Sequence, residues 1–92
     1  MCIRDSNDIV AFGVLGGVRA AGIEVGTSFG VVGFDDLADS PFQSPPLTTL
    51  AVPTNELGER AAQMLLERVE NPELPARSVV LRPELIVRAS TI

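Results

Sequence analysis

Gly30-Val31-Val32-Gly33-Phe34-Asp35-Asp36 is the stretch of sequence that decides the fold class, and Pro45-Pro46-Leu47-Thr48-Thr49 follows it. The first stretch is a run of glycine and apolar residues that ends in two carboxylates. This pattern is typical of a buried parallel strand that reaches the surface at its C-terminal end. In open α/β sheets, ligands bind at that edge. The stretch therefore predicts an α/β fold with a ligand crevice beside the carboxylates.

Two interpretations of these carboxylates stay open on spacing alone. A carboxylate at the strand edge can accept two hydrogen bonds from a hydroxyl-rich ligand. Alternatively, Asp35 and Asp36 only cap the next turn, because Asp favours turns in which its own side chain forms a hydrogen bond. Adjacent residues of a strand point to opposite faces, so the two carboxylates are not expected to flank one bond of a substrate.

The composition indicates an α/β protein and a piece of a larger one. At 92 residues, a chain buries only about 60–65% of its extended surface, so an independent core is marginal. Yet 46% of the residues are hydrophobic and only 4% are aromatic, so the apolar content is mostly aliphatic. No apolar stretch approaches the roughly 20 residues of a membrane span, and we expect no membrane partner.

The polar residues exclude most enzyme classes. The chain contains no His and no Lys, so a Ser nucleophile has no base, and most zinc chemistry is excluded as well. The lone Cys2 cannot form an internal disulfide or a metal site. We therefore expect no enzymatic activity, no cofactor and no bound metal. Residues 1–6 lack the apolar core of a secretory signal, which favours a cytoplasmic location.

The predicted elements follow the order α-β-loop-β-α-β-β. They are a helix over 8–21, a strand over 29–34, a loop over 37–46, a strand over 47–52, a helix over 54–71, and strands over 78–81 and 84–88. Residues 1–6 fit none of these elements, so we expect a disordered lead or sequence foreign to the fold. Three glycines inside the first helix, Gly13, Gly16 and Gly17, predict that another surface packs closely against it.

An ordered set of short motifs runs through the chain from residue 7 to its end. It comprises Asn7-Asp8, Ala11, Gly13, Gly22, Val31 to Asp36, Pro45 to Thr49, Leu57-Gly58, Pro83-Glu84-Leu85, Arg88, Ser90 and Thr91. In this order, the motifs resemble the C-terminal end of the lactose-repressor (LacI/GalR) family of bacterial transcription regulators. Residues 1–6 depart from the family pattern, which has an apolar strand there.

The resemblance implies a fragment of a periplasmic-binding-protein-like, doubly wound sheet in a sensor domain. Residues 7–52 and 78–92 would belong to its C-terminal subdomain, and residues 53–77 to its N-terminal subdomain. Members of the family close two such subdomains on a small effector, and this closure sets their affinity for operator DNA. The implied function is effector sensing, with a sugar or a nucleoside-like molecule as the effector. The alternative is a fragment of a periplasmic sugar-binding protein that serves a transporter.

The resemblance also implies roles for individual residues. Asn7 and Asp35 stand where family members contact the effector, and an Asn side chain offers both a donor and an acceptor. Phe12, Pro41 and Phe42 stand at positions that form the family's homodimer interface, although Phe12 can equally be a core residue. DNA would be bound only through a helix-turn-helix headpiece that this fragment lacks.

The charge of the chain generates a first testable prediction. The net charge is −5, and the seven basic residues, all Arg, are scattered, so no basic face can release counterions from DNA. We expect no mobility shift of operator or unrelated DNA with micromolar protein at physiological salt. A complete LacI/GalR regulator on its operator is the positive control, and a retarded band with the present chain would contradict the prediction.

Overall fold

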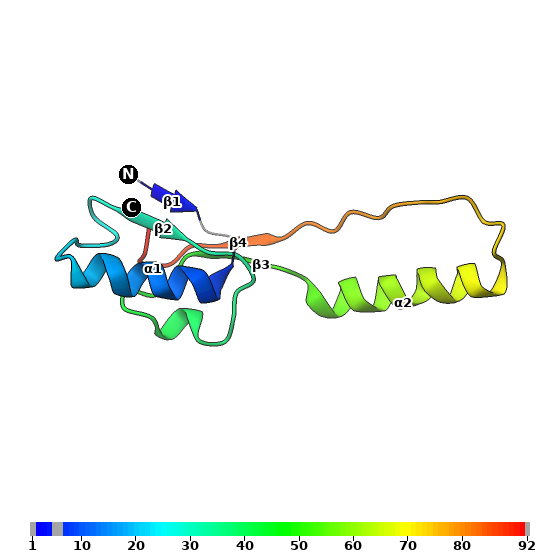
Figure 1. Ribbon diagram of the computed structural model, residues 1–92, viewed down its shortest axis with the longest axis horizontal. Helices are drawn as coiled ribbons and strands as arrows, with labels where there is room; N and C mark the ends of the chain where they lie inside the picture. Colours follow the sequence, from blue (N-terminus) through cyan, green and yellow to red (C-terminus); the bar gives the residue numbers. More distant parts are fainter. Residues whose placement is uncertain (1, 5–6, 92) are drawn as a thin grey trace. The chain divides into compact units, whose positions relative to one another are not determined.

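The structure is a computed structural model that describes residues 2–4 and 7–91 (Figure 1). The chain divides into two compact units. The first comprises Met1–Val52 together with Glu84–Ile92, and the second comprises Pro53–Pro83. Within the described residues, neither helix combines the length and the hydrophobicity that crossing a membrane requires.

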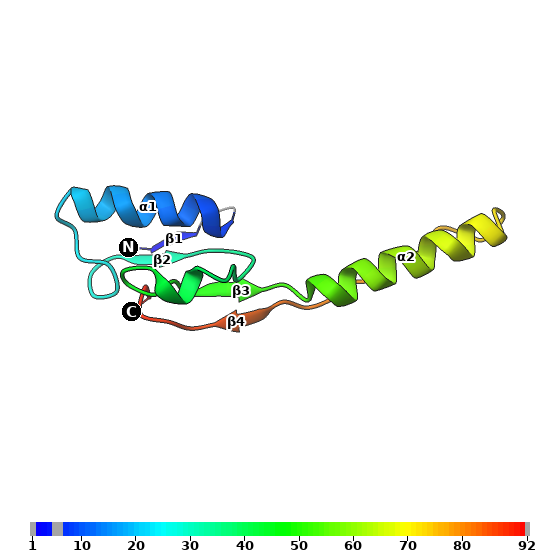
Figure 2. The same ribbon diagram turned by 90° about the horizontal axis from the view of Figure 1, so that it is seen from below.

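The first unit is an α/β layer built from short elements. These are β1 (Cys2–Arg4), α1 (Asp8–Ala20), β2 (Gly30–Val32), the 3-10 helix η1 (Ser40–Phe42), β3 (Thr49–Ala51) and β4 (Glu84–Ile86). β1 pairs in parallel with β2, and β3 pairs antiparallel with β4. Single parallel bridges from Val32 to Thr48 and from Asp35 to Ala51 join the two pairs. Figure 2 shows α1 lying along one side of these strands.

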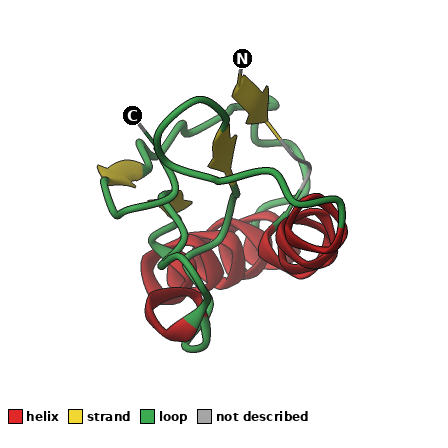
Figure 3. Cartoon of the chain, turned by 90° about the vertical axis from the view of Figure 1, so that its left-hand side faces the viewer, coloured by secondary structure: helices red, strands yellow, loops and turns green. Residues whose placement is uncertain are grey.

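The predicted α/β class and both helices are confirmed, but the strands are shorter than expected. The strand predicted over 29–34 is β2, and the one predicted over 47–52 is β3. Loops make up much of the first unit, as the end-on view in Figure 3 shows. The strand predicted over 78–81 is wrong, because this segment has no strand partner among the described residues. A run of apolar residues becomes a strand only where a neighbour satisfies its backbone groups.

The disorder expected for residues 1–6 is wrong for β1. Ile3 lies opposite Val31 in the parallel pair, because the edge of β2 offers backbone groups that a second strand can satisfy. Residues 1, 5 and 6 lie outside the described residues. That the lead is foreign to the fold stays a prediction.

The ends of α1 follow from its sequence. Asn7 is the N-cap, and its side-chain oxygen accepts a hydrogen bond of 2.9 Å from the amide of Val10. At the other end, Gly22 has φ +77°, and the amides of Gly22 and Ile23 donate back to Arg19 and Val18 at 3.0 and 3.1 Å. This is a Schellman ending, in which a left-handed residue is needed just beyond the helix.

The apolar core between α1 and the strands is small. Its buried members are Ala11, Leu15, Val31 and Leu47. Apart from the adjacent residues and backbone of α1 itself, no described atom lies within 4 Å of the position where a Cβ on Gly13, Gly16 or Gly17 would stand. The surface predicted to pack on these glycines is therefore missing from the described part of the chain.

Asp8 holds the loops of the first unit against α1. Its carboxylate is fully buried, and it accepts hydrogen bonds from the Thr49 hydroxyl at 2.7 Å, from the Leu37 amide at 2.9 Å and from the Ser40 hydroxyl. Burial alone would raise the pKa of this carboxyl. The hydrogen bonds outweigh that effect and hold the pKa of Asp8 below its ordinary value.

The C-terminal residues return across the strands and complete this unit. The Ser90 hydroxyl donates to the Val31 carbonyl at 2.6 Å and accepts from the Thr48 amide at 2.7 Å. The Ser90 carbonyl also accepts from the Val31 amide at 2.9 Å. Ser90 therefore joins Val31 and Thr48, which are 17 positions apart in the chain, through hydrogen bonds that no regular strand ladder supplies.

The second unit contains α2 (Thr54–Glu70) and the extended segment that follows it. No residue of α2 is buried, and Leu65, Leu66 and Val69 are each more than 60% exposed. Apart from Met64, which lines a cavity against the segment that follows, the apolar side chains of α2 are therefore exposed within the described chain.

The contact between Asp8 and Gly33 leads to a prediction about stability. A Cβ on Gly33 would stand 2.2 Å from the Asp8 carboxylate and 2.9 Å from a methyl group of Leu47. Both partners are buried, so we expect Gly33→Ala to lower the free energy of unfolding by about 1–3 kcal/mol. Urea denaturation followed by circular dichroism measures this loss. Gly13→Ala is the matched control, and we expect it to stabilise α1 by about 0.5–1 kcal/mol. Equal urea midpoints for Gly33→Ala and the unchanged protein would refute the close approach of Gly33 to Asp8 and Leu47.

The lowered pKa of Asp8 predicts an acid sensitivity. A carboxyl whose pKa is lower in the folded state stabilises the fold above its unfolded pKa, about 3.9, and this contribution is lost as the pH falls through the folded value. We expect Asp8→Asn to be less stable than the unchanged protein near pH 6, and the difference to shrink below about pH 4. Asp39→Asn, an exposed carboxyl, is the control. A stability difference that persists at pH 2–3 would contradict this role for the charge.

Candidate functional site

The chain turns sharply as it leaves β2, at the place where the sequence predicts a ligand crevice. Asp35 has φ +120° and Asp36 has φ +57°, values that residues with a side chain rarely adopt. The amide of Asp35 donates to the Leu50 carbonyl at 2.9 Å, and the amide of Asp36 donates to the Thr49 hydroxyl at 3.3 Å. β3 therefore holds a strained turn in place, and strain that is held in this way is concentrated at functional sites.

The two adjacent carboxylates have different surroundings. Asp36 is half-buried, and one of its oxygens accepts a hydrogen bond of 2.8 Å from the guanidinium of Arg88. The Asp35 side chain is exposed and forms neither a hydrogen bond nor an ion pair with any described residue. Neither carboxylate caps the following turn within the described chain. Asp36 is thus a structural partner of Arg88, whereas Asp35 is free to accept hydrogen bonds from outside.

Asn7 reaches the same edge from the start of α1. The amide of Asp8 donates to the Phe34 carbonyl at 3.0 Å, which places the beginning of the helix beside the end of β2. The side-chain oxygen of Asn7 caps the helix, and its amide nitrogen donates to no residue in the described chain. The edge therefore offers one free donor from Asn7 and one free carboxylate from Asp35.

Sequence reasoning did not find the residues that support this edge. Asp8 was named only as part of a family motif, and no individual role was given to Thr49, Ser40 or the Asp36–Arg88 pair. Arg88 lies 52 positions from Asp36. A local pattern carries no information about partners so far apart, although a polar Thr inside an apolar strand is a signal that its hydroxyl has a buried partner.

The three residues predicted for a dimer interface lie on one side of the first unit. Phe12 and Phe42 line the same surface cavity between α1 and the η1 segment, together with Leu15, Gly16, Arg19, Gln43 and Ser44. Pro41 lies within η1, and Phe42 is 84% exposed. Phe12 is half-buried and packs against the core, as one of the two roles considered for it requires, and its role in a dimer interface stays a prediction.

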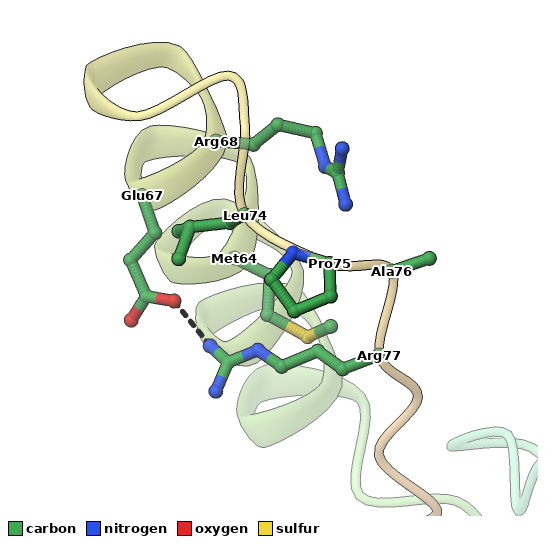
Figure 4. A pocket seen from close by; sticks show the side chains of 7 residues that line it. All are labelled: Met64, Glu67, Arg68, Leu74, Pro75, Ala76 and Arg77. Carbon is green, nitrogen blue, oxygen red and sulfur yellow. Dashed lines mark hydrogen bonds and ion pairs between the residues drawn. The ribbon is translucent and has the colours of Figure 1, made fainter.

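The second unit has a cavity of its own between α2 and the segment after it. Met64, Leu74 and Pro75 line it, and Arg77 forms an ion pair with Glu67 at its rim (Figure 4). Its lining contains one carboxylate, that of Glu67, which is paired with Arg77. Across the described residues, no three His, Cys, Asp or Glu side chains gather as a metal site would require.

The sequence matches known proteins over nearly its whole length. Residues 2–91 match the family of periplasmic binding protein-like domains. The chain is 37% identical over 84 residues to the HTH-type transcriptional repressor PurR of Mannheimia succiniciproducens, covering 91% of this chain and 25% of PurR. It is 37% identical over 87 residues to the HTH-type transcriptional regulator GalR of Lacticaseibacillus casei, covering 95% of this chain and 26% of GalR. The chain thus spans about a quarter of these relatives, which are transcriptional regulators and not enzymes.

Solved structures of regulators share the fold. The transcriptional regulator CelR in complex with cellobiose superposes with a TM-score of 0.90 at 29% identity, over 97% of this chain and 27% of CelR. A lac repressor dimer bound to operator and the anti-inducer ONPF superposes with a TM-score of 0.88 at 30% identity, over 99% of this chain and 32% of the repressor chain. A LacI-family regulator of Enterococcus faecalis with bound ribose superposes with a TM-score of 0.88 at 36% identity, over 99% of this chain and 34% of that regulator.

The α/β layer, the ordered motifs and these matches agree. The chain belongs to the periplasmic binding protein-like family, as a fragment of the effector-binding domain of a LacI/GalR-type transcriptional regulator.

Proposed function

We propose that this chain contributes one wall of the effector pocket in a LacI-type repressor, and that the effector is a small sugar or a nucleoside-like molecule. The observation that carries the proposal is the free Asp35 carboxylate on the strained turn after β2, beside the capping Asn7. A carboxylate paired with an amide donor suits the hydroxyl groups of a sugar. Cellobiose and ribose, bound by two of the related regulators, are ligands of this kind.

Within the complete regulator, we place this chain in a doubly wound, two-subdomain sensor. Residues 7–52 and 78–92 form part of the C-terminal subdomain, and residues 53–77 belong to the N-terminal one. Two facts support the boundary at residue 52: the described chain separates into compact units after Val52, and no residue of α2 is buried. The compact unit that contains α2 extends to Pro83 and not to residue 77. An apolar helix face of this kind is covered by packing against another surface. We expect this surface in the rest of the N-terminal subdomain.

The complete regulator is proposed to be a cytoplasmic homodimer that binds DNA through a separate headpiece. The dimer contact would use Phe12, Pro41 and Phe42 on the α1–η1 side of the first unit. The open space over the three glycines of α1 supports this placement, because small residues allow a partner surface to approach closely. The exposed ring of Phe42 would be buried in the same contact.

The pocket is tested by calorimetric titration of the complete regulator with ribose, cellobiose and adenosine. We expect one of these to bind and Asp35→Ala to weaken its binding by about 1.5–3 kcal/mol, a loss of tenfold to a hundredfold or more. Asp36→Ala is the matched control, because it removes the neighbouring carboxylate, which is paired with Arg88.

The control should leave affinity nearly unchanged and lower stability by less than about 1 kcal/mol, because the Asp36–Arg88 pair is partly exposed to solvent. If Asp36→Ala abolishes binding while Asp35→Ala retains it, the roles of the two carboxylates are reversed. If no compound binds to the unchanged regulator, the proposed effector class is wrong.

A further inference from the structure

The buried carboxylate of Asp8 connects two surfaces to which the proposed function assigns separate tasks. One of its oxygens accepts hydrogen bonds from the Leu37 amide, at 2.9 Å, and from the Ser40 hydroxyl. Leu37 ends the turn that carries Asp35, and Ser40 is the first residue of η1. A single oxygen atom therefore holds both the effector-binding turn and the segment of the proposed dimer contact.

The second oxygen of Asp8 fixes this arrangement to the strands. It accepts a hydrogen bond of 2.7 Å from the Thr49 hydroxyl on β3, and Gly33 lies so close that a Cβ there would overlap the same oxygen. η1 has further bonds of its own, since the Ser40 carbonyl accepts from the Leu47 amide at 2.9 Å. The carboxylate, the turn and η1 thus share one rigid anchor on β3.

The chemistry of this centre requires a carboxylate. Three donors converge on two oxygens, and an ionised Asp has only acceptors, so all three are satisfied. An Asn in the same place would direct an NH₂ group at one or two donors. Each donor that faces this NH₂ group loses the acceptor it binds, and the hydrogen bonds to the remaining oxygen lose their ionic character. Removal of the charge therefore affects the turn and η1 together.

We propose that Asp8 is a positioning residue that couples the Asp35 turn to η1, so that effector contacts at the pocket and packing at the Phe42 surface shift as one unit. This proposal rests on the proposed function for the roles of the two surfaces. The coupling itself is a property of the described residues and can be measured without any effector.

Hydrogen exchange of the complete regulator, followed by mass spectrometry, tests the coupling. In Asp8→Asn, we expect exchange over residues 35–37 and 40–42 to accelerate together by about tenfold or more, because each segment loses a charge-assisted hydrogen bond. Exchange over β2 should change by less than about twofold. Asp39→Asn is the matched control, because it removes a charge from the same loop, where the exposed Asp39 side chain caps nothing.

Ser40→Ala is a milder variant that removes a single hydroxyl. It tests the same coupling if Asp8→Asn does not fold. We expect it to accelerate exchange over 40–42 and also, to a smaller extent, over 35–37. If Ser40→Ala affects only residues 40–42, or Asp8→Asn accelerates the whole first unit equally, Asp8 does not couple the two segments and the proposal is overturned. An unchanged exchange rate in Asp8→Asn overturns it as well.

Effector affinity provides the functional readout, with ribose, cellobiose or adenosine as the probe that binds the unchanged regulator. We expect Asp8→Asn to weaken binding about tenfold and Asp39→Asn to leave it unchanged. Coupled exchange without binding of any probe would refute the effector assignment and keep the coupling. Uncoupled exchange with normal probe binding would refute the coupling and keep the effector assignment.

Discussion

The first unit depends on one buried carboxylate. Asp8 starts α1, and its oxygens bind the turn after β2, the 3-10 helix η1 and β3, three segments that are 29 to 41 positions away in sequence. Among the described residues, a core of four buried apolar side chains is too small to hold these loops by itself. Hydrogen bonds to a charged, fully enclosed group supply the directional restraint that so small an apolar core lacks.

The C-terminal residues of the chain also hold the strands of the first unit together. Ser90 bonds both to β2 and to the start of the β3 segment, and Arg88 pairs with Asp36. Residues at the two ends of the first unit are therefore needed for the same short sheet. By contrast, the helix and extended segment of the second unit bury no residue of α2. The uncovered helix is what we expect of a piece of a larger domain. The comparisons agree, because the chain matches only about a quarter of the length of each relative.

The arrangement at the edge of β2 separates a paired carboxylate from an unpaired one. Two adjacent carboxylates follow the same strand, yet a guanidinium neutralises Asp36 while Asp35 faces solvent. The strained backbone of both residues, held by β3, keeps this separation in place. A ligand with several hydroxyl groups can then use Asp35 without competing with an internal partner. The same unit has a second open surface, which is formed by Phe42 and the glycines of α1.

The sequence by itself determined the α/β class, both helices with their ends, and the family, because apolar periodicity, capping residues and ordered motifs are local properties of the chain. It also pointed to the strand edge at Asp35. Only the tertiary structure decided that Asp36 pairs with Arg88, that Cys2–Arg4 form a strand and that residues 78–81 do not. These outcomes depend on which distant groups meet, and a strand or a buried charge is stable only when such a partner satisfies it.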